Sequence, residues 1–217
     1  MTLRLPAFLA SACLALGLCA GAAHAQDGAP DVLVRKAIDD VLGTIKADKD
    51  LQNGNQKKVS DLIEAKILPH FDFTRMTRLA LGRNWAQASE AQKETLTREF
   101  RSLLVRTYST SLSQYRNQTI EVKAARLAAQ DQEAVVKTLV NQTGGQPIPI
   151  DYGVERTEKG WKVYDVVVDG VSLVTTYRSS FNDQIQKSGI DGLVKTLSER
   201  NRSAEAPRAT VKTEPKK

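Results

Sequence analysis

The most informative hydrophobic pattern lies between residues 161 and 197, where an apolar stretch passes through Asp169-Gly170 into an amphipathic segment. Alternation in the stretch 161–168 predicts a strand with apolar side chains on both faces, Trp161, Val163 and Val167 on one and Tyr164, Val166 and Val168 on the other. A strand that is apolar on both faces must be covered twice, by protein or by an apolar ligand. The pattern alone leaves both possibilities open.

Apolar residues recur at helical spacing in four segments of the first half of the chain, 30–48, 59–68, 72–82 and 89–115. Boundary signals agree with these helices. Pro69 ends the second, and Asp72 can cap the third. Ser89 with Gln92 three residues later forms a capping box that predicts the start of the long fourth helix.

After Asn117 the spacing changes from helical to alternating, which predicts four strands, 120–127, 134–141, 148–154 and 161–168. The connections between them are short and rich in glycine or polar residues, so antiparallel hairpins are expected. Two further helices, 174–185 and 190–197, follow the last strand. We therefore expect a single α+β domain in which helices pack on a curved antiparallel sheet of about four strands.

The N-terminal segment 1–25 has the features of a secretory signal peptide, with Arg4, an apolar core and the small-x-small site Ala23-His24-Ala25. Cleavage there predicts an exported protein that lacks cysteine, because both cysteines lie in this segment. A lipoprotein acylated at Cys19 is the alternative. Leu18 disfavours it, since a small residue normally precedes the modified cysteine.

The net charge of +6 is concentrated at the C-terminus. Residues 200–217 carry +4 and are expected to form a basic disordered tail that anionic membrane surfaces could attract, whereas the body, 26–199, carries only +1. This distribution gives no basic face for nucleic acid. After residue 25 no segment is apolar enough to predict a membrane span.

Candidate catalytic chemistry is sparse. After residue 25 the chain has one histidine, His70, and no cysteine, which argues against familiar zinc sites and histidine-dependent nucleophiles. There is no glycine-rich phosphate loop, so no cofactor or metal is expected. Asp165 beside Tyr164 could act as the general base of a small-molecule enzyme. A structural role, in which an arginine or backbone amides satisfy Asp165, is the stronger interpretation.

Enough apolar residues lie on the expected helices and strands to line a large ligand cavity, although each could equally belong to an ordinary core. The candidates for contact with an apolar ligand are Tyr108, Leu112, Tyr115, Ile150, Tyr152, Tyr164, Val166, Val168, Leu173, Val174 and Tyr177. Polar candidates near a cavity mouth are Arg83, Thr175 and Thr176.

Several of these positions also carry a resemblance to a known family. The chain resembles the MlaC family at Trp161, Tyr164-Asp165, Gly170-Val171-Ser172, Thr175-Thr176, Phe181 and Gly189-Ile190-Asp191-Gly192-Leu193, and upstream at Leu81-Gly82, Trp85, Phe100, Leu104, Tyr108 and Tyr115. The likeness covers most of residues 30–198. The tail after Arg200 has no such support.

The resemblance implies a nuclear-transport-factor-like (NTF2-like) cone and a function without catalysis. It implies a monomeric periplasmic carrier whose cargo is a phospholipid, with acyl chains between sheet and helices. The implied partners are an outer-membrane lipoprotein–porin complex and the MCE-type subunit of an inner-membrane ABC transporter. Residues 26–199 are the expected phospholipid-binding domain.

Overall fold

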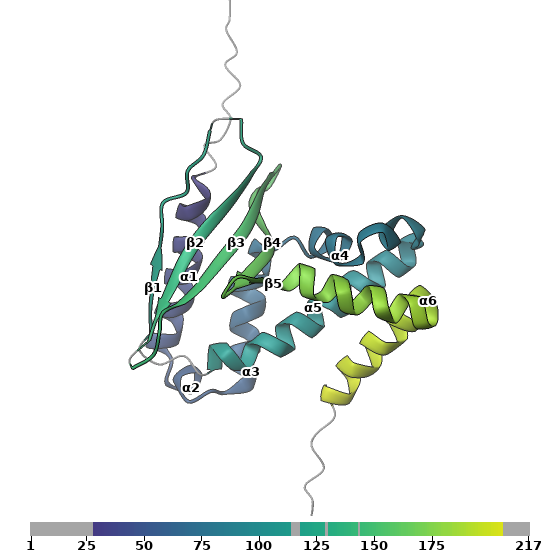
Figure 1. Ribbon diagram of the computed structural model, residues 1–217. Coiled ribbons are helices and arrows are strands. Elements are labelled where there is room, and N and C mark those ends of the chain that lie inside the picture. Colours follow the sequence, from purple (N-terminus) through teal and green to yellow (C-terminus); the bar gives the residue numbers. More distant parts are fainter. Residues whose placement is uncertain (1–27, 114–117, 129, 143, 206–217) are drawn as a thin grey trace, which may run out of the picture.

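The structure is a computed structural model that describes residues 28–113, 118–128, 130–142 and 144–205. It is a single α+β domain, with the long strands and α1 (Pro30–Ala47) at one end and α4, α5 and α6 gathered at the other (Figure 1). Hydrogen-bonded neighbours in the sheet are all antiparallel. The expected fold class is therefore confirmed.

The second expected helix, 59–68, is divided among a helix, a π-helical turn and a 3₁₀ turn that contains Pro69, so the prediction that Pro69 ends it is wrong. The third expected helix and the start of the fourth agree with their signals. Several helical elements lie between α1 and the sheet. They are α2 (Lys49–Gln52), α3 (Gln56–Leu62), the π-helical turn η1 (Ile63–Ile67), the 3₁₀ turns η2 (Leu68–His70) and η3 (Gly82–Gln87), α4 (Phe73–Leu81) and α5 (Glu90–Ser113). The Asp72 carboxylate caps α4 by accepting from Arg75 N at 2.8 Å. The capping box at α5 is confirmed, since Ser89 N donates to Gln92 Oε1 and Gln92 N donates to Ser89 Oγ.

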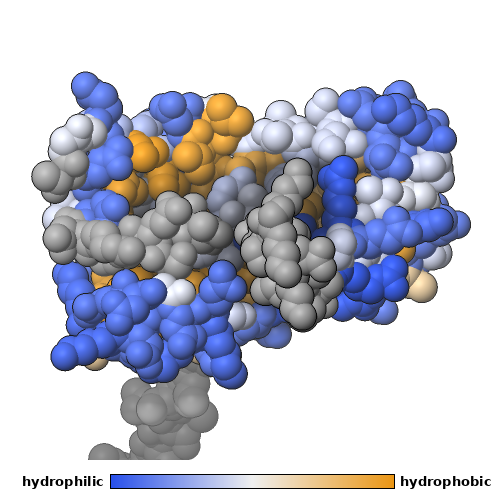
Figure 2. Space-filling view, turned by 90° about the horizontal axis from the view of Figure 1, so that it is seen from below, coloured by the Kyte–Doolittle hydropathy of each residue, from blue (hydrophilic) through white to orange (hydrophobic). Residues whose placement is uncertain are grey.

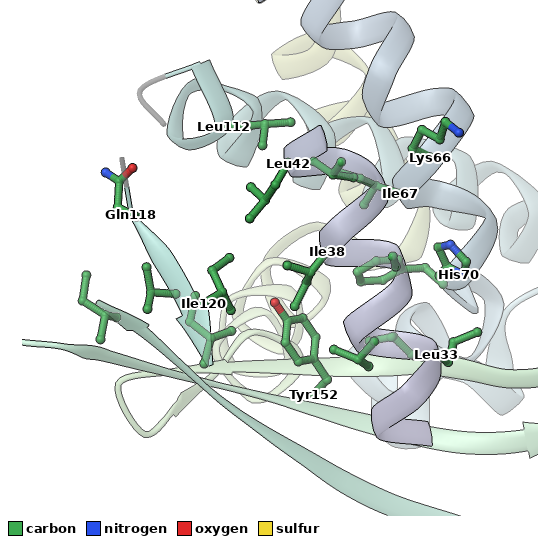
Figure 3. A pocket seen from close by; sticks show the side chains of 18 of the residues that line it. Leu33, Ile38, Leu42, Lys66, Ile67, His70, Leu112, Gln118, Ile120 and Tyr152 are labelled. Carbon is green, nitrogen blue, oxygen red and sulfur yellow. The ribbon is translucent and has the colours of Figure 1, made fainter. Parts of the chain in front are cut away.

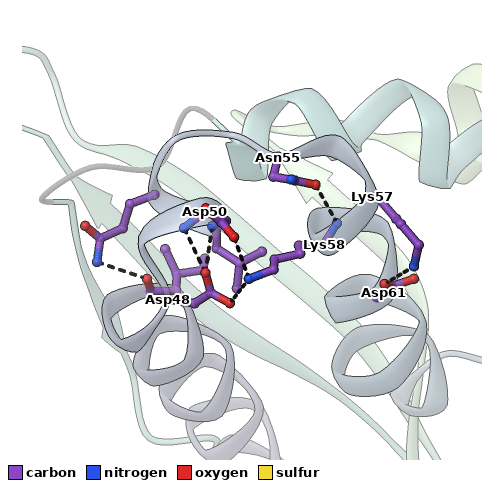
Figure 4. Close-up of polar contacts among 9 residues, drawn as sticks. Asp48, Asp50, Asn55, Lys57, Lys58 and Asp61 are labelled. Atoms are coloured by element: carbon purple, nitrogen blue, oxygen red, sulfur yellow. Dashed lines mark hydrogen bonds and ion pairs between the residues drawn. The ribbon is translucent and has the colours of Figure 1, made fainter.

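A polar cluster closes the turn between α1 and α3 (Figure 4). Lys58 Nζ lies 2.8 Å from one carboxylate oxygen of Asp48 and 2.8 Å from one of Asp50. The other oxygen of Asp48 accepts from the backbone amides of Asp50 and Leu51, which caps α2. These contacts fix the end of α1 relative to α3.

The sheet has the order β1-β2-β3-β4-β5, in which each strand pairs with its neighbour in sequence. The strands are β1 (Thr119–Val122), β2 (Glu133–Asn141), β3 (Ile148–Thr157), β4 (Gly160–Val168) and the two-residue β5 (Val171–Ser172). The four expected strands are present. β1 is shorter than the expected segment 120–127, whereas β3 extends three residues past its expected end.

A β-bulge between β3 and β4 changes which side chains share a face. Gly153 pairs with Asp165 and Val154 pairs with Val163, so Tyr164 is the extra residue of β4. As a result Val163 and Val166 both pack with the cluster on the inner face of the sheet. The uninterrupted alternation expected for residues 161–168 is therefore wrong beyond Val163, because one inserted residue resets the period of two.

The C-terminal α6 (Leu173–Glu205) consists of two helical parts, because Gly189 has a φ of 71° and interrupts the helix. The two expected helices correspond to these parts. The second part continues through Glu205, beyond the boundary expected at residue 199, and it is held by Asn201, whose buried amide donates to Glu99 O at 2.9 Å and to Glu99 Oε2 at 2.7 Å. The expected signal peptide, 1–25, and residues 206–217 of the expected tail lie outside the described residues.

Buried apolar side chains form three clusters. The helical cluster joins α4, α5 and α6 through residues such as Met76, Phe100 and Phe181. The sheet cluster joins α1 to the inner face of the sheet through Val34, Val122, Val136, Val154, Trp161 and Val163. The hairpin cluster joins α1 to α2, α3 and η1 through Val41, Ile45, Leu51, Val59, Leu62 and Ile63. α1 thus contributes to two clusters, one toward each end.

Arg75 connects α4 to the sheet. Its guanidinium lies 4.0 Å from the centre of the Tyr164 ring, pairs with Glu155 of β3, and has Nη2 2.6 Å from Glu133 Oε1 of β2. The Tyr164 hydroxyl also donates to Glu133 Oε2 at 3.1 Å. The bonds from Arg75 and then Tyr164 hold the pKa of Glu133 below its ordinary value of 4.5, although partial burial opposes this.

We expect Arg75→Met to lower the free energy of unfolding by about 2–3 kcal/mol, because two charge-assisted contacts are lost while the carboxylates stay in place. A lowered folded pKa of Glu133 stabilises the protein above pH 4.5, and this contribution is lost as pH falls through the folded value. Urea unfolding at several pH values should show a weaker loss of stability in acid for the variant.

Lys57→Met is the control, because Lys57 forms an exposed pair with Asp61 on α3, with a side chain 84 % exposed. Such a pair contributes only about 0.3–0.5 kcal/mol. Equal stabilities of the two variants would contradict the role given to Arg75.

Candidate functional site

A cavity of about 540 Å³ lies between α1 and the inner face of the sheet (Figure 3). α1 supplies one wall with Leu33, Val34, Ala37, Ile38, Val41 and Leu42. The sheet supplies the facing wall with Ile120, Val140, Ile148, Ile150, Tyr152 and Val163. In the close-up the side chains of Ile38, Leu42, Ile120 and Tyr152 point toward one another across this space. Hydrophobic residues are also visible from outside on the lower face of the molecule (Figure 2).

The cavity stays open because α1 is fixed near both ends. Val34 is buried in the sheet cluster, and Ile45 is buried in the hairpin cluster. Arg35 Nη2 also donates to Val122 O of β1 at 2.6 Å. Between these contacts, Ala37, Ile38 and Leu42 face the cavity. α1 therefore spans the space without collapsing onto the sheet.

A few polar side chains interrupt the apolar wall, and they are Lys66, His70, Gln118, Gln142 and Tyr152. Within the described ranges the wall includes no aspartate or glutamate. Burial raises the pKa of Tyr152, so its hydroxyl stays neutral and remains a hydrogen-bonding group at physiological pH.

The environment of His70 disfavours its charged form. Burial is the main cause that lowers the pKa of the imidazole below 6.5, and the positive charges of Lys162 and Lys36 add to it, while Asp40 partly opposes it. Lys162 is itself held nearby, because its Nζ donates to Pro69 O at 2.5 Å. His70 is therefore neutral at pH 7.

Of the residues expected to contact an apolar ligand, the structure brings Leu112, Ile150 and Tyr152 together in the cavity wall. Tyr115 lies outside the described residues. Val174 and Tyr177 pack in the helical cluster, where the Tyr177 ring lies 4.9 Å from that of Phe100. Tyr164 lies under Arg75.

The remaining expected residues are not among those that line the cavity. Tyr108 is exposed on α5, and Leu173 is partly buried at the start of α6. Val166 and Val168 are partly buried on β4, paired with Tyr152 and Ile150. Arg83, Thr175 and Thr176 are exposed, on η3 and at the start of α6. A direct contact of these residues with a ligand stays a prediction.

The α1 wall is the largest part of the site that the sequence analysis did not assign to the cavity, and the strand residues Ile120, Val140, Ile148 and Val163 and the segment 66–71 were not assigned to it either. A signal for the α1 wall exists, because apolar residues occur in adjacent pairs at 33–34, 37–38 and 41–42 and make a broader stripe than a single contact surface needs. That breadth indicates a helix that faces more than one partner. Here the partners are the sheet, the hairpin cluster and the cavity.

Asp165 has a structural role next to the bulge. One carboxylate oxygen accepts from the amides of Val166 at 2.8 Å and Val174 at 3.1 Å, and the other accepts from Ser172 Oγ at 2.6 Å. Ser172 in turn accepts from Thr175 N and caps α6. The expected structural interpretation of Asp165, satisfaction by backbone amides, is confirmed.

No cluster of three or more metal-ligating His, Cys, Asp or Glu side chains occurs among the described residues. In the same part of the chain, no helix combines the length and hydrophobicity needed to cross a bilayer. The site that the structure does define is a mostly apolar cavity with a few polar groups, within the range of about 300–1,000 Å³ that is typical of sites for small ligands.

A mostly apolar cavity of this size in an α+β domain is typical of proteins that bind a small ligand. Residues 35–199 match the family described as MlaC protein, so the chain belongs to the MlaC family, and the expected resemblance is confirmed.

Similar proteins of known name agree with this assignment. The toluene tolerance protein ttg2D of Pseudomonas putida is 26 % identical over 84 % of this chain and 88 % of its own length. The intermembrane phospholipid transport system binding protein MlaC of Haemophilus influenzae is 24 % identical over 76 % of this chain and 78 % of its own. A solved phospholipid-binding protein from Ralstonia solanacearum, in complex with a phospholipid, is 45 % identical with a TM-score of 0.76, covering 82 % of this chain and 99 % of that one.

We expect the imidazole of His70 to titrate below pH 6.5, measured by NMR on its ring protons, because burial and nearby lysines disfavour the charged form. Lys162→Gln should raise this pKa but leave it below 6.5, since burial is the larger cause. Lys159→Gln, in the exposed turn before β4, is the control and should leave the pKa unchanged.

Because the unfolded chain binds this proton more readily, His70 also lowers the stability of the fold as pH falls below 6.5. A pKa at or above 6.5 would contradict the position assigned to His70 at the edge of an apolar cavity.

Proposed function

We propose that this protein binds phospholipid and carries it through the periplasm, with acyl chains inside the cavity between α1 and the sheet. The observation that supports this function best is the large apolar cavity itself. An apolar space of this size is costly to maintain in a folded protein unless a ligand fills it.

The dimensions of the cavity suit an acyl chain. Leu33 and Leu42, which both line it, are nine residues apart on α1, and at about 1.5 Å per residue this gives a length of about 14 Å. One leaflet of a bilayer occupies half of a hydrocarbon core of about 30 Å. The cavity is therefore about as long as one acyl chain in a membrane.

The energetics of transfer explain why a carrier is required. Moving one methylene from lipid to water costs about 0.8 kcal/mol, so a diacyl lipid with about 30 methylenes would lose more than about 20 kcal/mol on entering water. A cavity with an apolar wall offsets most of this free-energy cost, because it keeps the methylenes out of water. Since the chains supply most of the affinity, selectivity for the head group is expected to be modest.

The comparisons support the choice of cargo. A protein 45 % identical to this chain was solved with a phospholipid bound, and a further relative is named as the binding protein of an intermembrane phospholipid transport system. On this basis we propose that the protein is exported through its N-terminal segment 1–25. As a monomer it would exchange lipid with an outer-membrane lipoprotein–porin complex and with the MCE-type subunit of an inner-membrane ABC transporter.

No observation favours the alternative function, an enzyme with Asp165 as general base. Asp165 already accepts three hydrogen bonds and is not among the residues of the cavity wall. We therefore propose a function without catalysis.

Protein purified under native conditions should carry phospholipid, detected by native mass spectrometry and by lipid extraction. Ala37→Trp should reduce the bound fraction, because the indole would occupy the middle of the cavity wall. Displacing only two methylenes removes about 1.6 kcal/mol, which lowers affinity by about tenfold or more. The melting temperature of the delipidated variant should not fall below that of the delipidated wild type, since the ring adds apolar contacts in the cavity, whereas loss of bound lipid alone would lower it.

Ala86→Trp is the matched control, because Ala86 is exposed on η3 and is not part of the cavity wall. It should leave the bound lipid unchanged. Wild-type protein that contains no lipid, or an Ala37→Trp variant that binds lipid as well as the control, would contradict the proposed function.

A further inference from the structure

The cavity has polar groups of different character on the two sides of α1. Lys66 and His70, from the segment η1–η2, lie on one side, and Gln118 lies on the other (Figure 3). Gln142, which follows β2, is the other amide of the wall. The side with Lys66 and His70 therefore presents basic groups, whereas Gln118 and Gln142 present only neutral amides.

Lys66 is not neutralised by the acids that neighbour it in sequence. Asp61 pairs with Lys57 at 2.7 Å, and Glu64 pairs with Arg101 of α5. Lys66 is exposed and lies at the rim of the cavity on η1, with its ammonium directed away from the apolar side chains of the wall (Figure 3). Since the described part of the wall contains no carboxylate, the positive charge of Lys66 remains available to a ligand.

Other charged groups around His70 extend this positive region. Lys36 and Asp40 face His70 from α1, Lys162 faces it from β4, and Lys66 lies one turn away on the same segment. Three lysines against one aspartate leave the region positive even when His70 is neutral. A positive charge beside an apolar cavity is a binding environment for an anionic amphiphile.

We propose that Lys66 and His70 form the head-group site of the cavity, where they bind the phosphate of the lipid and favour net-anionic over zwitterionic head groups. This proposal rests on the proposed function. A phosphate gains a charge-assisted contact with the lysine ammonium, which is a compact phosphate ligand. The quaternary ammonium of a zwitterionic head group finds no carboxylate in the described wall and is repelled by the lysines.

His70 makes this preference dependent on pH. Its pKa lies below the ordinary value, so the imidazolium forms only in acid, where it adds a second cation beside Lys66. The preference for an anionic head group should therefore increase as pH is lowered from 7 to 5.

The test is competitive loading of delipidated protein from vesicles that contain equal amounts of phosphatidylglycerol and phosphatidylcholine with identical acyl chains. Native mass spectrometry gives the ratio of the two bound lipids. The wild type should favour phosphatidylglycerol by about two- to fivefold, as expected for a partly exposed ion pair. Lys66→Gln should lower the ratio toward one without reducing the total lipid bound, with Lys36 and Lys162 accounting for any preference that remains.

Lys57→Gln is the matched control, because it removes the same charge from the preceding helix at a residue outside the cavity wall. It should keep the wild-type ratio. His70→Gln should keep the ratio at pH 7 and abolish its increase at pH 5. Higher salt should reduce the ratio for the wild type, since exposed charges are screened.

A wild-type ratio of one, or a ratio that Lys66→Gln leaves unchanged, would overturn the head-group site while the carrier function stands. Failure to load either lipid would instead overturn the proposed function. The experiment thus separates the two proposals.

Discussion

α1 is fixed at its two ends by different sets of side chains, and the cavity depends on that arrangement. Val34 packs against the inner face of the sheet, whereas Ile45 packs against α2, α3 and η1. If only one end were held, the hydrophobic effect would favour closing Ile38 and Leu42 onto Tyr152 and its neighbours, because apolar surfaces without a ligand gain by contact. Fixing both ends prevents that collapse, so an apolar wall can remain available to a hydrocarbon chain.

Most of the fold could be predicted from the sequence because its signals are local. The capping box at Ser89 and the glycine that interrupts α6 act on a few adjacent residues. The bulge at Tyr164 could not be predicted, since it depends on how β4 registers against Gly153 of β3. For the same reason only part of the cavity wall was predicted. Periodicity shows that a face is apolar, but not whether protein or open space covers it.

Two polar side chains join elements of the fold, and one of them, Asp165, was the catalytic candidate of the sequence analysis. Asp165 links β4 to the first turn of α6, and Arg75 links α4 to three strands. Each lies within a few residues of a cavity-lining residue in the sequence, Val163 for Asp165 and Phe71 for Arg75, yet neither is itself part of the cavity wall. The carboxylates that take part in these contacts, those of Asp165, Glu133 and Glu155, are not among the residues that line the cavity. The wall keeps an apolar character with basic groups at one side, which suits an anionic amphiphile better than a reactive polar substrate.

The division of the buried side chains into three clusters has a consequence for motion. Residues of the sheet cluster and of the hairpin cluster line the cavity. Among the described residues, the helical cluster of α4, α5 and α6 contributes only the partly buried Phe71 to the cavity wall. Local opening in proteins follows such cooperative units. Amide hydrogens of α1 and the inner strands should therefore exchange more slowly when the cavity is occupied, while those of α4, α6 and the part of α5 in the helical cluster, which excludes Leu112 of the cavity wall, change little. In this sense a bound ligand would act as a removable part of the core for one half of the protein, while the helical cluster would serve as a scaffold that depends little on it.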